Sequence, residues 1–196
     1  MIFKERREYM RKNLTKNNGF SLTELIIVVA VMVILAAVVA PVLYRYIDKS
    51  RKADDVESAG VIAKAMNVAL SDEEAYDAVM ASANSADGKA QILLVAKNGD
   101  TEWTRRAGVD PNGSLKKIMD TVCPPPAVKC KREVDPASSG STNADYAAGT
   151  DEFEPDGWAI CLVKNQPCVL ITDGTTDPAG VPKGVALNPM LCADYN

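Results

Sequence analysis

The sequence predicts an α+β fold, in which one long N-terminal helix packs its second half on a small antiparallel sheet. Three observations support this. Residues 25–40 form a run of 16 residues without a polar side chain. A helical pattern of apolar and polar residues then continues to about residue 70. Near the C-terminus, two apolar runs rich in β-prone residues flank a polar turn within 157–173, which predicts an antiparallel hairpin.

The apolar run is long enough to cross a membrane. The 24 residues from Phe20 to Leu43 reach about 36 Å as a helix, and the hydrocarbon core of a bilayer is about 30 Å thick. We therefore expect this segment to span with some tilt. Pro41 lacks an N–H and its ring clashes with the preceding turn, so we expect a bend or a loosened turn near residues 37–41.

Glu24 is the one charged residue within this segment. A carboxylate near the end of a membrane helix either reaches the headgroups or finds a partner. Residues 1–19 hold six basic and two acidic residues, a net of +4, which predicts that they stay cytoplasmic. A cut after Gly19 would create an α-amine at Phe20, one turn from Glu24, where it could neutralise the carboxylate of a neighbouring chain.

These residues resemble the class III signal of type IV pilins and pseudopilins. A basic leader ends in Gly19, Phe20 follows, Glu24 is fifth after the cut, and Pro41 is twenty-second. The similarity covers the N-terminal third of the chain, and beyond about residue 70 the sequence resembles no family. It implies the pilin-like ladle: a hydrophobic half-helix in the membrane and an amphipathic half-helix on the sheet.

The resemblance also implies a function. A prepilin peptidase would cut at Gly19–Phe20, Phe20 would be N-methylated, and subunits would polymerise through their N-terminal helices. The chain would be a structural subunit of a surface filament for adhesion, motility or DNA uptake, held in the cytoplasmic membrane before assembly and extracellular afterwards. Its partners would be copies of itself, other pilins and the pilus assembly machinery. A pseudopilin of a type II secretion or competence system is the alternative.

An ordinary secretory signal peptide is the competing interpretation of the N-terminus. Its apolar core would be residues 25–35, with Ala37 and Ala40 at the cleavage site. A cut after Ala40 would place Pro41 just past the broken bond, which is unfavourable. The 16-residue run is also slightly long for such a signal.

Composition limits the remaining functions. Removing the leader leaves 177 residues, of which about 125 follow the long helix and form one head domain. The chain carries −4, so the processed form carries −8, which argues against binding a phosphate backbone. The chain has no histidine, which excludes His-dependent triads and His-ligated zinc. We expect no cofactor and no enzymatic activity; a single-pass membrane-tethered enzyme is a distant alternative.

Five cysteines follow the helix, and none forms a C-x-x-C pair: Cys123, Cys130, Cys161, Cys168 and Cys192. In an exported domain, the expected state is two disulfides and one free thiol. We favour a Cys123–Cys130 bond across the CPPPAVKC loop, and a second bond from Cys192 to Cys161 or Cys168. In a reducing environment all five would be free.

The predicted domains are a leader at 1–19, the apolar half-helix at 20–43, an amphipathic half-helix at 44–71 and a head at 72–196. Apolar or small residues at 56, 59, 63, 66 and 70 form the inward face of the amphipathic half. We expect the charged side chains of residues 49–57, Asp55 among them, to stay in solvent. Ser71 and Glu74 read as a capping box for a second helix that ends near residue 83. The alternative is one helix over 44–83.

Within the head, residues 91–96 fit either a strand or a helical turn, and Trp103 is expected to pack on the core. Ser114 is expected to cap a short helix that the prolines at 124–126 end. Residues 133–157 are predicted to form a long acidic surface loop. A calcium site is one interpretation of its carboxylates, and a solvated loop without a bound ion is the favoured one. Pro167 should lie at the hairpin turn or an edge. The tail from residue 175 is expected to wrap as irregular chain, anchored by Leu187, Leu191 and Cys192.

Overall fold

The structure is a computed structural model of the 196-residue chain. It describes residues 19–83, 91–106, 108–134, 153–163, 166–174 and 184–188. The chain divides into two compact units, Met1–Arg45 and Tyr46–Asn196, and each is described by itself.

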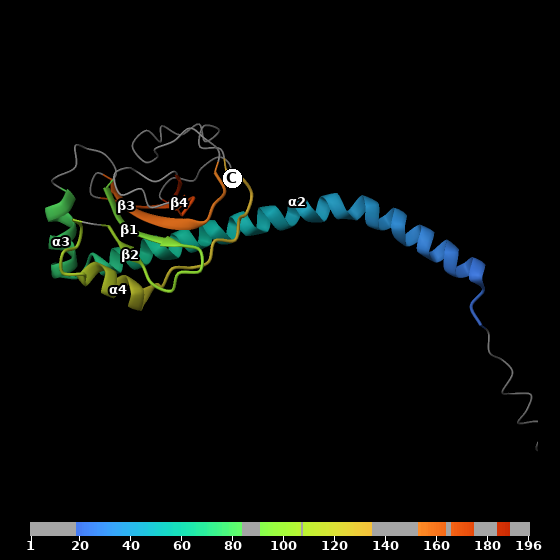
Figure 1. The fold of residues 1–196 in the computed structure, drawn as a ribbon, viewed down its shortest axis with the longest axis horizontal. Coiled ribbons are helices and arrows are strands. Elements are labelled where there is room, and N and C mark those ends of the chain that lie inside the picture. The colour runs from blue at the N-terminus through green and yellow to red at the C-terminus, as the bar shows by residue number, and fades with distance from the viewer. Residues whose placement is uncertain are drawn as a thin grey trace, which may run out of the picture. The chain divides into compact units, whose positions relative to one another are not determined.

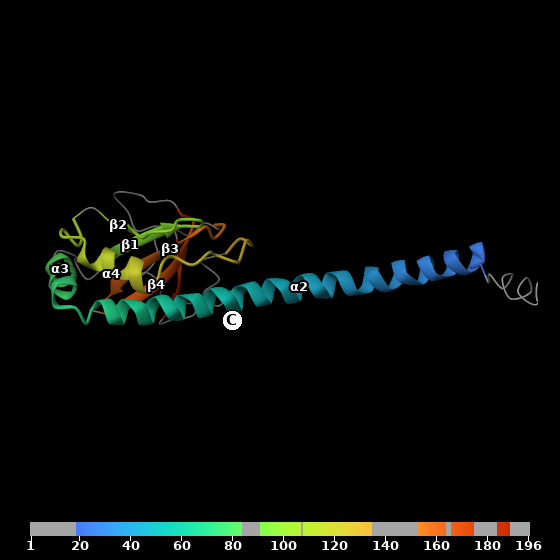
Figure 2. The same ribbon diagram turned by 90° about the horizontal axis from the view of Figure 1, so that it is seen from below.

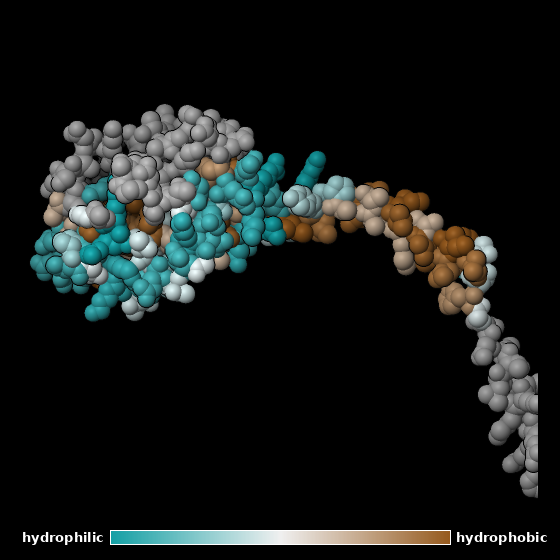
Figure 3. All heavy atoms as spheres, viewed as in Figure 1, coloured by the Kyte–Doolittle hydropathy of each residue, from teal (hydrophilic) through white to brown (hydrophobic). Residues whose placement is uncertain are grey.

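Helix α2 (Leu22–Ala69) is continuous and belongs to both units (Figure 1). It passes through Pro41, so this proline does not end the helix; the expected bend stays a prediction. In the first unit the large apolar side chains are uncovered, with exposed fractions from 45% at Val28 to 87% at Phe20. Figure 3 shows them as a continuous apolar surface along this part of α2.

The second unit is built on a five-stranded antiparallel sheet of order β2-β1-β3-β4-β5. The strands are β1 (Gln91–Lys97), β2 (Thr104–Arg105), β3 (Gly157–Val163), β4 (Gln166–Thr172) and β5 (Gly184–Asn188). The predicted hairpin is confirmed as β3 and β4, which pair without a break from Gly157↔Thr172 to Val163↔Gln166. The segment that periodicity left open, 91–96, is a strand.

Both faces of the sheet are buried, because the strands alternate between two apolar clusters. On β3, Trp158, Ile160 and Leu162 join the larger cluster. Helices α2, α3 (Glu73–Ala83) and α4 (Ser114–Val122) contribute to the same cluster, and Figure 2 shows α2 and α4 along this face. The smaller cluster on the other face includes Ala159, Cys161 and Cys168.

The inward face of α2 in the second unit follows the predicted spacing. Ala59, Ala63 and Met66 are buried, and Val56 and Leu70 are partly buried against the same cluster. Trp103 is buried as expected, and Ala75 and Val79 of α3 are buried too, all three with no exposed surface. The helical period of the sequence was therefore sufficient to place this part of the core.

Asp55 corrects the prediction of a solvated charged face, because its side chain is fully buried. Its two carboxylate oxygens accept the backbone N–H groups of Lys129 and Cys130, each at 2.8 Å. Burial raises the pKa of Asp55 above that of an ordinary aspartate, and the two N–H donors offset this only in part. The folded protein therefore holds the Asp55 proton more tightly than the unfolded chain does. This proton binding stabilises the fold fully below the pKa of Asp55 in the unfolded chain, and the stabilisation is lost as the pH rises through the pKa of Asp55 in the folded protein.

The segment from Cys123 to Cys130 has no helix or strand, yet side chains hold it at several points. The indole N–H of Trp103 donates to the Cys123 carbonyl at 2.7 Å, and that of Trp158 donates to the Pro126 carbonyl at 2.7 Å. These bonds satisfy two carbonyl groups of a segment that is only partly buried and has no regular structure of its own.

Cys123 and Cys130 are free thiols in the structure, as Cys161 and Cys168 are, so the expected Cys123–Cys130 disulfide stays a prediction. The Cys123 thiol lies 3.9 Å from the Pro124 carbonyl oxygen, and the Cys130 thiol lies 3.9 Å from that of Arg132. Each thiol is thus directed toward its own neighbouring backbone. Cys192 lies outside the described residues, so its predicted bond does too.

The start of α3 also differs from the prediction. Asp72, not Ser71, is the cap, because its carboxylate accepts the Ala75 N–H at 3.1 Å and its carbonyl accepts the Tyr76 N–H at 2.9 Å. The break between Ala69 and Glu73 rules out one helix over 44–83.

The start of α4 differs from the prediction as well, because Ser114 is its first residue and Gly113 is at the N-cap position. The acceptor for the first turn comes from buried Asp110, which accepts the Lys116 N–H at 3.1 Å and the Ser114 hydroxyl at 3.2 Å. Asp110 therefore takes the capping role that Ser114 was expected to have.

The tail is not wholly irregular, because Gly184–Asn188 forms β5 beside β4. Val185 and Leu187 of β5 belong to the larger cluster and are buried. The pairing of β5 with β4 brings them to this face of the sheet. Pro167 lies in β4 before the pairing with β5 begins at Val169, so no described bond to β5 is lost there. Leu191 and most of the predicted loop 133–157 lie outside the described residues.

A pair of glycine variants tests the packing of the second unit. A Cβ at Gly157 would lie 2.5 Å from the Ala96 carbonyl oxygen across the β1–β3 ladder, so we expect Gly157→Ala to destabilise by about 1–3 kcal/mol. Gly60 lies in α2 with open space around a built Cβ, so we expect Gly60→Ala to stabilise by about 0.5–1 kcal/mol. Denaturant unfolding of the full chain in detergent measures both, and equal effects of the two substitutions would contradict this packing.

A second variant pair tests the buried carboxylate. Asp55→Ala leaves two N–H donors without an acceptor, at about 1–3 kcal/mol for each, so we expect a severe loss of stability in the same assay. Asp54→Ala removes the neighbouring exposed carboxylate and is expected to change stability by less than about 0.5 kcal/mol. Similar stability of the two variants would show that Asp55 does not hold the segment.

Candidate functional site

The candidate site lies at the start of α2, where Glu24 is the third residue of the helix. The Leu25 N–H donates to the Ser21 carbonyl at 3.2 Å, which opens the helix. The Ser21 N–H donates back to the Glu24 Oε2 atom at 2.9 Å. This is the carboxylate half of a capping box.

The capping role of Glu24 was missed in the sequence, although Ser21-Leu22-Thr23-Glu24 matches the S-x-x-E pattern. The carboxylate lies in the first turn, where the helix dipole favours negative charge. One oxygen accepts the Ser21 N–H, and a carboxylate has acceptor sites for several further donors. Glu24 can therefore cap its own helix and still accept a hydrogen bond from a second chain.

Gly19 and Phe20 are both exposed, and Phe20 has 87% of its surface uncovered. A Cβ built on Gly19 would meet no atom within 4 Å. The peptide bond between them is thus accessible to another protein. In the uncut chain the Phe20 nitrogen is an amide, so the predicted amine partner of Glu24 would exist only after cleavage.

The apolar half of α2 adjoins this site. By length and composition, α2 is a helix that could cross a membrane, and the apolar stretch of it is not buried within the structure. A patch of exposed apolar residues this long marks a surface that contacts lipid or protein. The arrangement therefore combines a polar, capped helix start with an apolar surface that needs cover.

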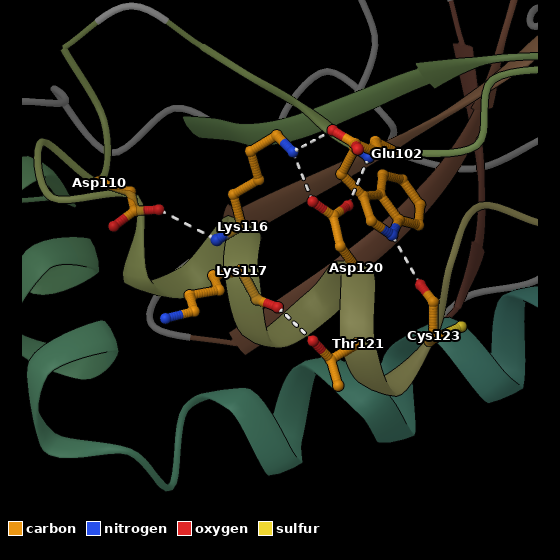
Figure 4. A network of polar contacts seen from close by, with 8 residues as sticks. Glu102, Asp110, Lys116, Lys117, Asp120, Thr121 and Cys123 are labelled. Atoms are coloured by element: carbon orange, nitrogen blue, oxygen red, sulfur yellow. Dashed lines mark hydrogen bonds and ion pairs between the residues drawn. The ribbon is translucent and has the colours of Figure 1, made fainter.

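The second unit holds an open cavity of about 530 Å³ beside Trp103 and α4. Lys116 lines it and forms ion pairs with Glu102 at 3.0 Å and Asp120 at 2.5 Å (Figure 4). The hydrogen bond that the Lys116 ammonium donates to Asp120, followed by the one that it donates to Glu102, raises the pKa of Lys116. Asp120 also accepts the Trp103 backbone N–H at 2.7 Å, so this network fixes Trp103 and α4 in place.

No cluster of three potential metal ligands occurs among the described residues. The acidic loop where a calcium site was considered lies mostly outside them. Of its acidic residues, Glu133, Glu154 and Asp156 are described, and all three are exposed.

Comparison with known proteins gives one match. A family model described as the prokaryotic N-terminal methylation motif matches residues 14–40. The matched segment contains Gly19, Phe20 and Glu24 and ends one residue before Pro41. No curated protein and no solved structure matches the chain. The long apolar helix and the small antiparallel sheet are consistent with a pilin-like α+β fold. The chain therefore carries, at residues 14–40, the methylation motif that is the class III signal of type IV pilins.

Proposed function

We propose that this protein is a structural subunit of a type IV pilus, cut at Gly19–Phe20 and polymerised through α2. The observation that supports this most directly is the coincidence of two features on one helix. The methylation motif spans residues 14–40, and the apolar part of the same helix is uncovered in the monomer. Membrane anchoring before assembly accounts for that surface in the monomer, and neighbouring helices cover it in the filament.

Replacing lipid by protein around α2 gives little net hydrophobic gain, because lipid already covers the same apolar surface. Assembly therefore depends on helix packing and on polar pairs. In this proposal the new α-amine of Phe20 pairs with Glu24 of a neighbouring subunit. The amine cannot form before cleavage, so cleavage also controls when polymerisation begins. The partners are copies of this chain, other pilins, the prepilin peptidase and the assembly machinery.

A structural role is also proposed in preference to catalysis. The chain has no histidine, and Lys116, one of two cations that line the open cavity, is paired with two carboxylates. Hydrolytic activity of the purified protein would argue for the membrane-tethered enzyme. We infer no role in binding a specific nucleic acid. The acidic head domains would lie on the outside of the filament.

A pseudopilin of a secretion or competence system is the second candidate, because it shares the motif. The presence of Glu24 disfavours the tip-type pseudopilins, which resemble this motif but lack that residue. Electron microscopy of surface filaments labelled for this chain separates the two. Long labelled filaments favour a pilus, and a short periplasmic assembly favours a pseudopilin.

Processing is tested by mass spectrometry of the protein isolated from its membrane. We expect a mature N-terminus at Phe20 that bears one methyl group. The control is expression of the chain in cells that lack a prepilin peptidase, which should leave residues 1–19 in place. A mature chain that begins after Ala40 would instead show an ordinary signal peptide and overturn the proposal.

Glu24 variants test the pairing. Glu24→Gln keeps an oxygen for the Ser21 N–H but loses the charge, whereas Glu24→Ala loses both. If the charge pairs with the Phe20 amine, both variants insert and are cut, but both give far fewer filaments than wild type. Glu57→Gln, an exposed acid on α2 beyond the apolar run, is the control and should assemble normally. Normal filaments from Glu24→Gln would refute the pairing and leave only the capping role.

A further inference from the structure

Two cysteines lie directly opposite each other in the central hairpin. Cys161 of β3 is the register partner of Cys168 of β4, within seven consecutive antiparallel pairs. Cα atoms of directly opposed residues lie about 4.5–5.5 Å apart, inside the range of about 4.4–6.8 Å that disulfides need. No movement of either strand is required to bring the two residues within bonding range.

The two side chains also share a face. Both belong to the smaller apolar cluster, with Ala159 and Leu170 as neighbours, and both are buried, with 0% and 1% of their surface exposed. In the structure both are free thiols. The other described cysteines, Cys123 and Cys130, lie outside the strands and have no register partner of this kind.

Burial determines when these thiols can react. It raises the pKa of Cys161 strongly, with a further rise from Cys168 and a smaller lowering by Arg106. Burial also raises the pKa of Cys168 to about 12. Because the thiolate is the reactive form, neither residue exchanges readily once the sheet has formed. Oxidation therefore belongs to the folding stage, before the cluster closes, and the finished bond is protected from reduction.

We propose that Cys161 and Cys168 form a cross-strand disulfide in the exported protein. The oxidant is a disulfide, either of an oxidoreductase or of a small thiol. One cysteine thiolate attacks it and releases one thiol, and the second cysteine then attacks the mixed disulfide and releases the other. The two cysteines lose two protons and two electrons, and the oxidant disulfide is reduced to two thiols. The proposed function is needed only for the claim that the protein reaches an oxidising compartment. The choice of Cys161 and Cys168 as partners depends on the strand register alone.

The bond would fix the register of β3 against β4. A shift of one residue would move every side chain of one strand to the opposite face. Because β3 also pairs with β1 and β4 also pairs with β5, this register sets the alignment of the whole sheet. A disulfide here closes an eight-residue loop around the turn.

Peptide mapping tests the pairing, because Lys164 lies between the two cysteines. The full chain is refolded in detergent with glutathione disulfide, alkylated, denatured and cut with trypsin. We expect peptides 133–164 and 165–183 to appear as one linked species that separates on reduction. Each peptide contains one cysteine, so the link identifies the bond. Alkylated cysteines in both peptides, or a link from either peptide to 184–196 through Cys192, would overturn the proposal.

Stability measurements add a second readout. We expect the protein refolded with reductant to unfold at a thermal midpoint lower by on the order of 5 °C than the protein refolded with glutathione disulfide. Cys161→Ala and Cys168→Ala should each abolish this effect of reductant, and the double variant should behave like either one. Cys123→Ala and Cys130→Ala are the matched controls and should retain it. A reductant effect that survives in Cys161→Ala would contradict the bond, whether or not the chain forms filaments.

Discussion

The second unit depends on one buried carboxylate. Asp55 links α2 to residues 129 and 130, which lie 74 and 75 positions further along the chain. The segment that it holds also receives the indole N–H groups of Trp103 and Trp158, and Trp158 belongs to β3. A chain of hydrogen bonds therefore runs from the helix through an irregular segment to the centre of the sheet. A charge in such a place is costly unless it is fully hydrogen-bonded, and here two N–H donors meet it.

Helix α2 has two chemically different halves. In the second unit the inward apolar residues of α2 pack with the sheet and with α3 and α4, so that part is held by ordinary core packing. In the first unit its apolar residues are exposed and need lipid or other helices. Glu24 caps the start of the exposed half, because one of its oxygens accepts the Ser21 N–H. In the filament that we propose, the same carboxylate would also accept the amine of a neighbour.

The sheet is unusual in being buried on both faces although its strands are antiparallel. This explains why β3 and most of β4 read as continuous apolar runs and do not alternate with polar residues. It also explains the position of the cysteines, since small, apolar thiols suit a closely packed face. The opposition of Cys161 and Cys168 follows from the register of the hairpin, in which residues 163 and 166 are partners and every pair behind them is in step.

The sequence by itself determined what depends on local pattern. It determined the methylation motif, the inward face of α2, the hairpin, α4 and the burial of Trp103, because helical and strand periods and turn residues act over a few positions. Only the tertiary structure decided the rest. Asp55 looks like a surface acid until a segment 74 positions away provides its N–H donors. Strand β5 forms by pairing with β4, which a sequence pattern of the tail alone does not indicate. Such features depend on which distant groups meet, and a local pattern contains no information on that.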